Sequence, residues 1–191
     1  DNRASHTGAE LKFSSTPWEL ATGGLAVALG LEGRREELEQ ENAEVLYTGD
    51  IIGGGGVLPS LTTTTRRVWS LFGEAIVPLA RSLEAALAVR HDQYSDFGGS
   101  TNPKVTLRWQ AARNAVVRGS VGTGFRAPTL SDLHLPTIPG LVFGFPDPLR
   151  CPVTGAEEDC GEGFYRSKGG GNPDLQPETS RSVNAGIVLE P

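Results

Sequence analysis

The sequence predicts an all-β protein: an antiparallel, up-and-down segment of a transmembrane β-barrel with about seven strands. Three observations support this fold class. Apolar and polar side chains alternate along several segments; Gly and Pro are frequent, at 25 and 13 of 191 residues; and short connections alternate with longer ones. Because Gly and Pro mark turns, this composition favours many short elements over a few long helices.

Alternation with period two defines six segments of the chain, and successive side chains of a strand point to opposite faces of a sheet. The clearest segment is 104–110, where Val, Leu and Trp alternate with Lys, Thr, Arg and Gln. A weaker strand is expected over roughly 9–20, interrupted by Pro17. The apolar positions of the six segments include Leu25, Val27, Leu29, Leu31, Trp69, Leu71, Ala75, Val77, Leu83, Ala85, Leu87, Val89, Val105, Leu107, Trp109, Val117, Val121, Phe125, Val183, Ala185, Ile187 and Leu189.

The connections between these segments differ in length. Those at 21–24, 78–82 and 111–114 are short, whereas those at about 41–66 and 129–177 are long. Transmembrane barrels have short periplasmic turns and longer extracellular loops. We therefore interpret 1–191 as one partial barrel domain whose long loops are extracellular.

The charged positions predict which face meets lipid. An Arg or Lys on the lipid face costs about 2–4 kcal/mol at the midplane. The charged face is therefore expected to line a water-filled lumen, and the Val, Leu and Trp face to contact outer-membrane lipid. A soluble antiparallel sheet would alternate in the same way, but the loop lengths and the aromatic residues Trp69 and Trp109 favour the membrane. The lumen-facing candidates are Arg90, Lys104, Arg108, Arg118 and Arg126.

Charge and hydropathy exclude some classes of protein. The net charge of −6 and pI of about 5.1 argue against nucleic acid as a partner, since phosphate binding needs a basic surface. No apolar run approaches the roughly 18 residues of a transmembrane helix. The first residues lack the basic start and apolar core of a signal peptide, so the chain is expected to be an internal fragment.

Three stretches resemble the barrel of TonB-dependent receptors. The first pairs 71–74 (LFGE) with 89–98 (VRHDQYSDFG), and the second is 119–130 (GSVGTGFRAPTL) followed by Asp132 and Leu133. The third is 171–180 (GNPDLQPETS), which is similar to an Asn-Pro-x-Leu-x-Pro-Glu signature at the start of a strand. The family-motif residues are Phe125, Arg126, Ala127, Pro128, Asn172, Pro173, Leu175, Pro177 and Glu178.

The resemblance implies a barrel of about 22 strands with a plugged lumen, in a Gram-negative outer membrane. It further implies energy-dependent uptake of a small-molecule ligand such as a siderophore, cobalamin or a saccharide, without a cofactor. The sequence contains no plug domain, so the TonB complex is expected to act through a missing part of the parent protein. Arg126 is expected to pair with lumen acids or to bind an anionic ligand. Pro128 is expected to end its strand because proline lacks an N–H.

Cys151 and Cys160 lie in the same long connection, with no further Cys or His nearby. An even number of cysteines in an oxidising compartment favours a disulfide. Zinc is the alternative, and it lacks further ligands. The pair is therefore expected to close a small loop.

Catalytic signals are weak. His6, His91 and His134 are scattered without metal-ligand spacing, and no nucleophile has a partnered base. The acidic residues at 36, 37, 39 and 41 are interpreted as a solvated strand end rather than a cation site. We therefore expect a binding and transport protein and not an enzyme, with an outer-membrane barrel enzyme or a soluble β-sandwich binding module as the alternatives. Because seven strands leave two open edges, the chain by itself should form a curved open sheet with disordered long loops.

Overall fold

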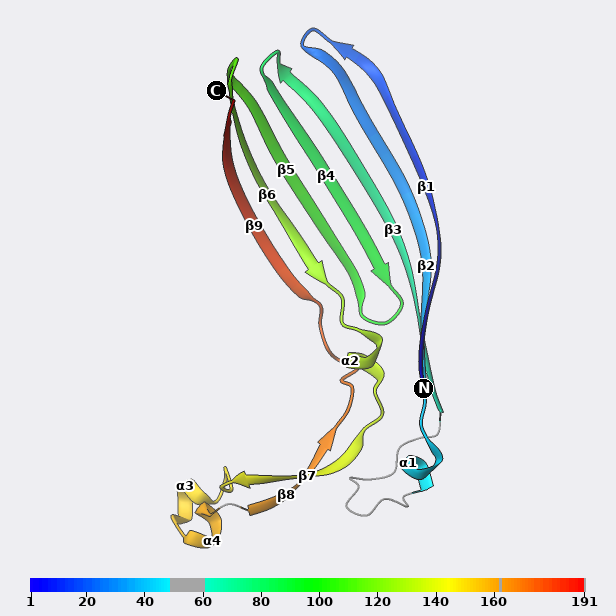
Figure 1. The fold of residues 1–191 in the computed structure, drawn as a ribbon, viewed down its shortest axis with the longest axis vertical. Helices are drawn as coiled ribbons and strands as arrows, with labels where there is room; N and C mark the ends of the chain where they lie inside the picture. The colour runs from blue at the N-terminus through cyan, green and yellow to red at the C-terminus, as the bar shows by residue number, and fades with distance from the viewer. Residues whose placement is uncertain (49–60, 162, 191) are drawn as a thin grey trace. The chain divides into compact units, whose positions relative to one another are not determined.

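The computed structural model of the chain describes residues 1–48, 61–161 and 163–190. Seven antiparallel strands form one sheet in the order β1-β2-β3-β4-β5-β6-β9, and β7 pairs with β8 in a second, two-stranded sheet (Figure 1). The predicted all-β, up-and-down segment of about seven strands is confirmed. The strands of the main sheet are β1 (Asn2–Leu20), β2 (Gly23–Glu41), β3 (Leu61–Ala80), β4 (Leu83–Tyr94), β5 (Gly98–Ala112), β6 (Ala115–Arg126) and β9 (Glu178–Leu189).

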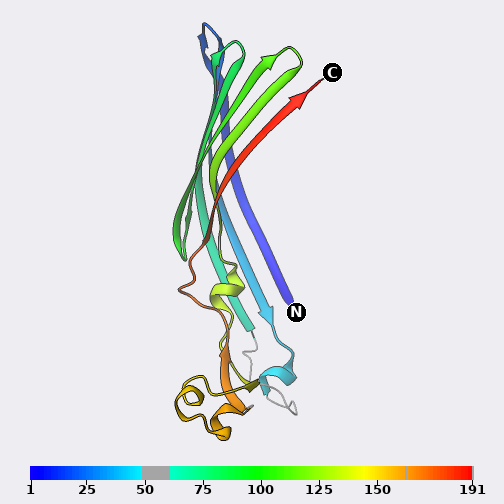
Figure 2. The same cartoon turned by 90° about the vertical axis from the view of Figure 1, so that its left-hand side faces the viewer.

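The chain divides into two compact units. One unit comprises Ser5–Glu37, Thr65–Pro128 and Leu175–Pro191, and it holds most of the main sheet. Figure 2 shows that the strands of this unit curve together and that the sheet stays open, with β1 and β9 at its edges. The other unit comprises Asp1–Ala4, Leu38–Thr64 and Thr129–Asp174.

The ladders show which residues share a face, because directly opposed residues of neighbouring strands project to the same side. Leu87 lies opposite Val105, and Val105 lies opposite Val121; this side, with the other apolar positions of the alternation, is called the apolar face. Ala88 lies opposite Lys104, and Arg108 lies opposite Arg118; this side is called the polar face. The strand pairing therefore places Arg90, Lys104, Arg108 and Arg118 on one face.

The apolar face has no cover within the described residues. Leu87, Leu107 and Val183 are 46%, 46% and 81% exposed. An apolar surface that extends over several strands marks a contact with lipid or with another protein.

None of the short helices in the described part of the chain has the length and apolar character needed to cross a membrane.

Two predicted strand boundaries were wrong. β1 begins at Asn2 and runs through Pro17 without a break, which is compatible with an edge strand, where a missing N–H need not interrupt a ladder. β3 begins at Leu61, inside the segment predicted as a loop to Arg66. The reason is the run of threonines before Arg66, because β-branched residues favour extended backbone.

The predicted loop 129–177 is also more ordered than expected. It contains the helix α2 (Leu130–His134) and the hairpin of β7 (Ile138–Phe145) and β8 (Gly163–Gly169), with the short helices α3 (Cys151–Thr154) and α4 (Glu157–Cys160) between these strands. The expectation of disorder was therefore wrong for this connection. In the other long connection, α1 spans Glu44–Thr48, and 49–60 lies outside the described residues.

Candidate functional site

The polar face carries a charge network where β2, β3 and β4 lie side by side. The guanidinium of Arg90 donates to Glu32 at 2.6 Å, to Asp92 at 2.8 Å and to the hydroxyl of Ser70 at 2.9 Å. Ser70 in turn donates to Asp92 at 2.5 Å, and both of these side chains are buried. Arg90 is therefore held by two carboxylates from two different strands.

The network continues through Arg34 towards the ends of the strands that join the long connections. Arg34 lies between two carboxylates, with distances of 3.0 Å to Glu32 and 3.0 Å to Glu36. Its remaining nitrogen donates to the hydroxyl of Tyr94 at 3.0 Å. The alternation of β2 thus places three charged side chains, at 32, 34 and 36, in one row of ion pairs.

Arg66 is the most deeply buried charge of the network, with a side chain that is 3% exposed. Its Nε lies 2.7 Å from Asp96, and its Nη1 lies 3.5 Å from Glu36. Nη2 donates to the carbonyl oxygen of Pro128 at 2.8 Å. The guanidinium also lies 5.4 Å from the centroid of the Tyr94 ring, within cation–π range. Each nitrogen of this guanidinium therefore has an oxygen partner, as a buried charge requires.

These contacts make the network a structural clamp rather than an open anion site. Arg34, Arg66 and Arg90 have carboxylate partners at Glu32, Glu36, Asp92 and Asp96. The predicted solvated acidic end of β2 also takes part in ion pairs, since Glu36 contacts Arg34 and Arg66, and Glu37 lies 2.9 Å from Arg35.

The other lumen-facing candidates have a different environment. Lys104, Arg108 and Arg118 form no ion pair with the described residues, and the guanidinium of Arg108 donates only to Gln110, at 3.2 Å. Lys104 and Arg118 border an open hollow of about 410 Å³ whose lining also includes Thr106, Ser120 and Asn184. Glu84 lies directly opposite Arg108 in the β4–β5 ladder, so the three cations of this part of the polar face have one carboxylate as a direct cross-strand neighbour.

The second and third family-like stretches, 119–130 and 171–180, meet at the start of β9. Arg126 lies directly opposite Glu178 in the β6–β9 ladder, and its Nη1 is 3.3 Å from the carboxylate. Both side chains are mostly exposed, at 67% and 73%. Arg126 was expected either to pair with an acidic side chain or to bind an anionic ligand, and the structure shows an ion pair with Glu178. Pro128 is buried just after β6 ends at Arg126, as expected for a proline at a strand end.

Phe125 departs from the alternation. Its position in β6 predicted a place on the apolar face with Val121, but its ring centroid lies 5.8 Å from that of Tyr94, a residue of the charge network. That assignment of Phe125 was wrong. The ladder between β5 and β6 ends at the pair Lys104–Gly122, so β5 does not constrain the direction of Phe125.

The start of the third family-like stretch, 171–180, is fixed by local hydrogen bonds. Thr129 and Asp132 form a reciprocal capping box at the beginning of α2. The backbone N–H of Asn172 donates to the carbonyl oxygen of Asp132 at 2.7 Å, and the Asn172 side chain accepts from the N–H of Asp174 at 3.0 Å. Asn172 is thus held to α2 by backbone contacts.

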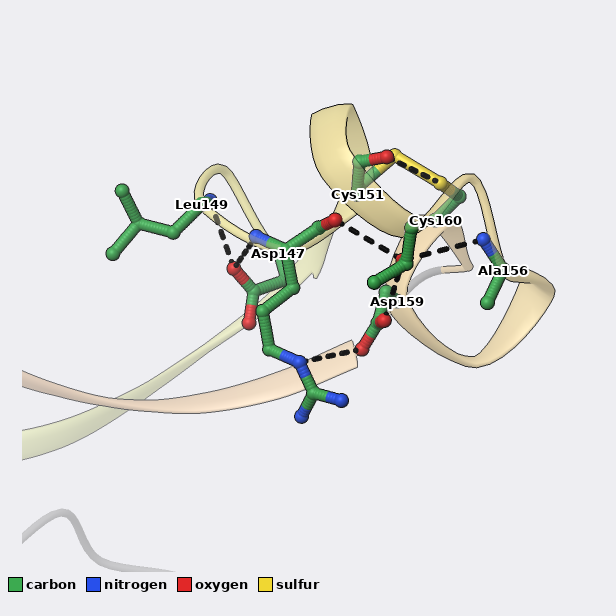
Figure 3. Close-up of a disulfide and its surroundings, with 8 residues drawn as sticks. Asp147, Leu149, Cys151, Ala156, Asp159 and Cys160 are labelled. Carbon is green, nitrogen blue, oxygen red and sulfur yellow. Dashed lines mark hydrogen bonds and ion pairs between the residues drawn. A yellow bond between two sulfur atoms is a disulfide. The ribbon is translucent and has the colours of Figure 1, made fainter.

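The predicted disulfide between Cys151 and Cys160 is present and joins α3 to α4 (Figure 3). Asp147 supports the same loop, because its carboxylate accepts the backbone N–H groups of Leu149 and Arg150, each at 2.9 Å. The N–H groups of Arg150 and Leu149 stabilise the charged form and lower the pKa of Asp147 below its ordinary value. Asp159 accepts from the hydroxyl of Thr154 at 2.6 Å.

Sequence reasoning missed the residues that complete the charge network. Arg66 was assigned to a loop, and Ser70 was given no role. Tyr94 and Asp96 lay in the family-like stretch 89–98 but were not assigned a contact. The usable signal was the continued alternation of β3 through Arg66, which places it on the same face as Ser70. Its partners could not be identified without the strand register. In the described residues, no group of His, Cys, Asp and Glu is arranged to hold a metal ion.

An open antiparallel sheet with one apolar face and one charged face fits the wall of an outer-membrane β-barrel. Residues 2–191 match the family model described as TonB dependent receptor-like, beta-barrel. The chain belongs to this family of Gram-negative outer-membrane receptor barrels, which excludes the soluble β-sandwich alternative.

Related proteins are consistent with this family. The chain is 29% identical over 154 residues to an iron-regulated outer membrane virulence protein of Vibrio cholerae serotype O1, an alignment that covers 81% of this chain and 18% of that protein. The siderophore receptor PirA from Acinetobacter baumannii has a TM-score of 0.68 at 18% identity, covering 100% of this chain and 25% of that one. A mutant of the ferric enterobactin receptor PfeA from Pseudomonas aeruginosa has a TM-score of 0.65 at 19% identity, covering 99% and 24%. The chain thus spans a quarter or less of these relatives.

Proposed function

We propose that the parent protein takes up an iron–siderophore complex across the outer membrane, and that this chain forms part of the barrel wall along the path of that ligand. The observation that carries the proposal is the family match over residues 2–191. The ligand class is supported by relatives that are named as iron-regulated or as siderophore receptors. Binding and transport, rather than catalysis, is therefore the proposed activity.

The polar face supports a position beside an aqueous lumen. The polar face carries charged side chains on five strands, and these would be costly in lipid. The apolar face has no charged side chain between its Trp, Leu and Val positions. In this orientation Arg90, Lys104, Arg108 and Arg118 face the lumen, and the connections 42–60 and 127–177 are extracellular. Arg126 follows Phe125 in an unbroken ladder with β9, so it projects to the side opposite Phe125.

The unpaired cations point to a negatively charged partner in the lumen. Arg108 lies opposite Arg118 on one side and opposite Glu84 on the other, so one carboxylate faces two arginines, and like charges in direct opposition destabilise a sheet. Lys104 lies on the same face nearby. We infer that carboxylates of the plug domain, or an anionic ligand in transit, balance these charges. The TonB complex would act on that plug and not on the residues of this chain.

The test is ligand uptake by the parent protein in a strain that lacks other receptors. Cells under iron limitation are offered radiolabelled iron bound to a siderophore, labelled cobalamin, or a labelled oligosaccharide. We expect iron to accumulate and the accumulation to stop when TonB is inactivated. Accumulation of cobalamin or saccharide alone would contradict the ligand class, and a lack of TonB-dependent uptake of all three would contradict the function.

A triple variant tests the role of the unpaired cations. Lys104→Gln, Arg108→Gln and Arg118→Gln together should lower uptake while the protein remains folded in the membrane. The control is Arg113→Gln, which removes a charge from the turn between β5 and β6. Equal uptake by the triple variant and the control would argue against an anionic partner.

A further inference from the structure

The ladder between β5 and β6 ends before the two strands do. Its last pair is Lys104–Gly122, whereas β5 begins six residues before Lys104 and β6 ends four residues after Gly122. Over these outer residues β5 still pairs with β4, and β6 still pairs with β9. The sheet therefore contains a seam, defined here as residues 98–103 of β5 and 123–126 of β6.

Pro103 explains why the ladder ends at this point. The N–H of Gln110 donates to the carbonyl oxygen of Ser82 beside β4, and the direction of bonding alternates along a strand. The odd-numbered residues of β5 therefore bond towards β6, and residue 103 would bond to Thr123. Because proline has no N–H to donate, the first hydrogen bond beyond the last pair of the ladder is missing.

Beyond the ladder, β6 turns towards the polar face. The hydroxyl of Thr123 donates to the side chain of Asn102 at 3.4 Å, and the ring centroid of Phe125 lies 5.8 Å from that of Tyr94. Asn102 and Tyr94 both belong to the polar face. A continued ladder would instead place Thr123 and Phe125 with Val121 on the apolar face, since side chains alternate along a strand.

Two contacts hold the end of β6 in this position. The guanidinium of Arg66 on β3 donates to the carbonyl oxygen of Pro128 at 2.8 Å, and Pro128 is buried. Tyr94, which contacts Phe125, is also buried and stacks on Phe97 with ring centroids 4.4 Å apart. The chain therefore leaves β6 on the polar side of the sheet.

The same turn carries a cation of β9 to the polar face. Arg181 lies directly opposite Thr123 in the β6–β9 ladder, and opposed residues project to the same side. The alternation of β9 would place Arg181 with Val183 on the apolar face. The seam thus keeps a charged side chain away from the face assigned to lipid.

We propose that Pro103 is a positioning residue for ligand passage. By withholding one N–H it keeps the outer end of β6 out of the ladder, and β6 and β9 then turn Thr123, Phe125 and Arg181 to the lumen. These side chains add an aromatic ring and a cation to the surface along which the ligand passes. The inference rests on the proposed function, because it uses the assignment of the polar face to the lumen.

Hydrogen exchange of the full-length parent protein in lipid nanodiscs, resolved to single amides, tests the seam. In the wild type the amide of Thr123 should exchange fast and that of Val121, which lies within the ladder, slowly. Pro103→Val and Pro103→Ala each restore the missing N–H and should slow exchange at Thr123 by about tenfold, the factor of one net hydrogen bond. The matched control Pro17→Val changes a proline of the edge strand β1 and should leave Thr123 unchanged.

Uptake of the radiolabelled iron–siderophore complex tests the role of the seam in the same variants. Each Pro103 variant should raise the half-saturating concentration of the complex by about fivefold, as for the loss of one polar contact, because the longer ladder turns Phe125 and Arg181 away from the lumen. The maximal TonB-dependent rate should stay close to that of the wild type. A folding defect would instead lower the maximal rate in proportion to the amount of protein in the membrane.

Each result decides one part of the proposal. Equal exchange at Thr123 and Val121 in the wild type, or unchanged exchange at Thr123 in both Pro103 variants, would overturn the assignment of the seam to Pro103. Slower exchange without a change in half-saturating concentration relative to Pro17→Val would overturn the positioning role alone. A lack of wild-type uptake would contradict the proposed function and with it the positioning role, whereas the exchange result tests the seam independently.

Discussion

Arg66 and Pro128, 62 residues apart in the sequence, are joined by a hydrogen bond of 2.8 Å from the guanidinium to the proline carbonyl oxygen. This contact links the first part of β3 to the second residue after the end of β6. The same guanidinium lies 2.7 Å from Asp96 in the turn between β4 and β5. One buried cation thus connects three segments at the ends of their strands.

Removal of Arg66 should therefore destabilise this end of the sheet. Arg66→Ala leaves Asp96 and the Pro128 carbonyl without their cation, and breaking a buried pair costs about 3–5 kcal/mol. The measurement is denaturant unfolding of the refolded parent protein in detergent. Arg126→Ala is the control, because its ion pair is largely exposed and should contribute at most about 1 kcal/mol. Equal losses of stability would contradict the clamp.

The orientation of β5 can be tested with one substitution on each face. Leu107→Arg should cost about 2–4 kcal/mol, because it places a charge on the apolar face in the hydrocarbon. Thr106→Arg should cost much less, because its neighbours on the polar face are Lys104 and Ser120. Unfolding free energies of the two variants in lipid vesicles provide the comparison. Equal costs would rule out this assignment of lipid and lumen faces.

The disulfide should stabilise its loop locally. Closure of about ten residues contributes roughly 2–3 kcal/mol by the chain-entropy model, so Cys151→Ser/Cys160→Ser should raise protease sensitivity between β7 and β8. On intact cells, a membrane-impermeant thiol reagent should label the two cysteines only after reduction. Labelling without reduction would exclude the disulfide in the native membrane, and no labelling after reduction would place the loop away from the cell surface.

Asp147 predicts a pH dependence of the same loop. Because its pKa is lowered by the N–H groups of Arg150 and Leu149, its stabilising effect is fully present above the ordinary pKa of an aspartate. The effect is lost as the pH falls through the lowered value. Hydrogen exchange of the Leu149 and Arg150 amides should therefore gain protection with rising pH, after correction for intrinsic rates. Asp147→Asn should abolish this dependence; a profile identical to the wild type would contradict the assignment.

Residues 1–191 alone should not form a stable soluble protein. The sheet ends in two open edges, β1 and β9, and its apolar face is exposed across the strands. Open edges and uncovered apolar faces favour aggregation. Analytical ultracentrifugation in detergent-free buffer should detect aggregates. A monodisperse monomer with cooperative melting would contradict both this expectation and the assignment of the chain to a membrane barrel.

The sequence by itself determined the fold class and the two faces of the sheet. Alternation around Val105, Leu107 and Trp109 is a local property, because each strand residue projects opposite to its neighbour. The disulfide was also accessible, since Cys151 and Cys160 share one connection. The short turns and Pro128 marked strand ends for equally local reasons.

Only the tertiary structure decided which charges meet. The partners of Arg66 depend on the register of β2 and β3 and on the position of the turn after Tyr94, and no local pattern encodes these relations. The contact of Phe125 with Tyr94 and the β7–β8 hairpin inside a predicted loop likewise depend on pairings between distant segments. Ion pairs are selected by distance in space, whereas alternation reports only the side of the sheet to which a residue points.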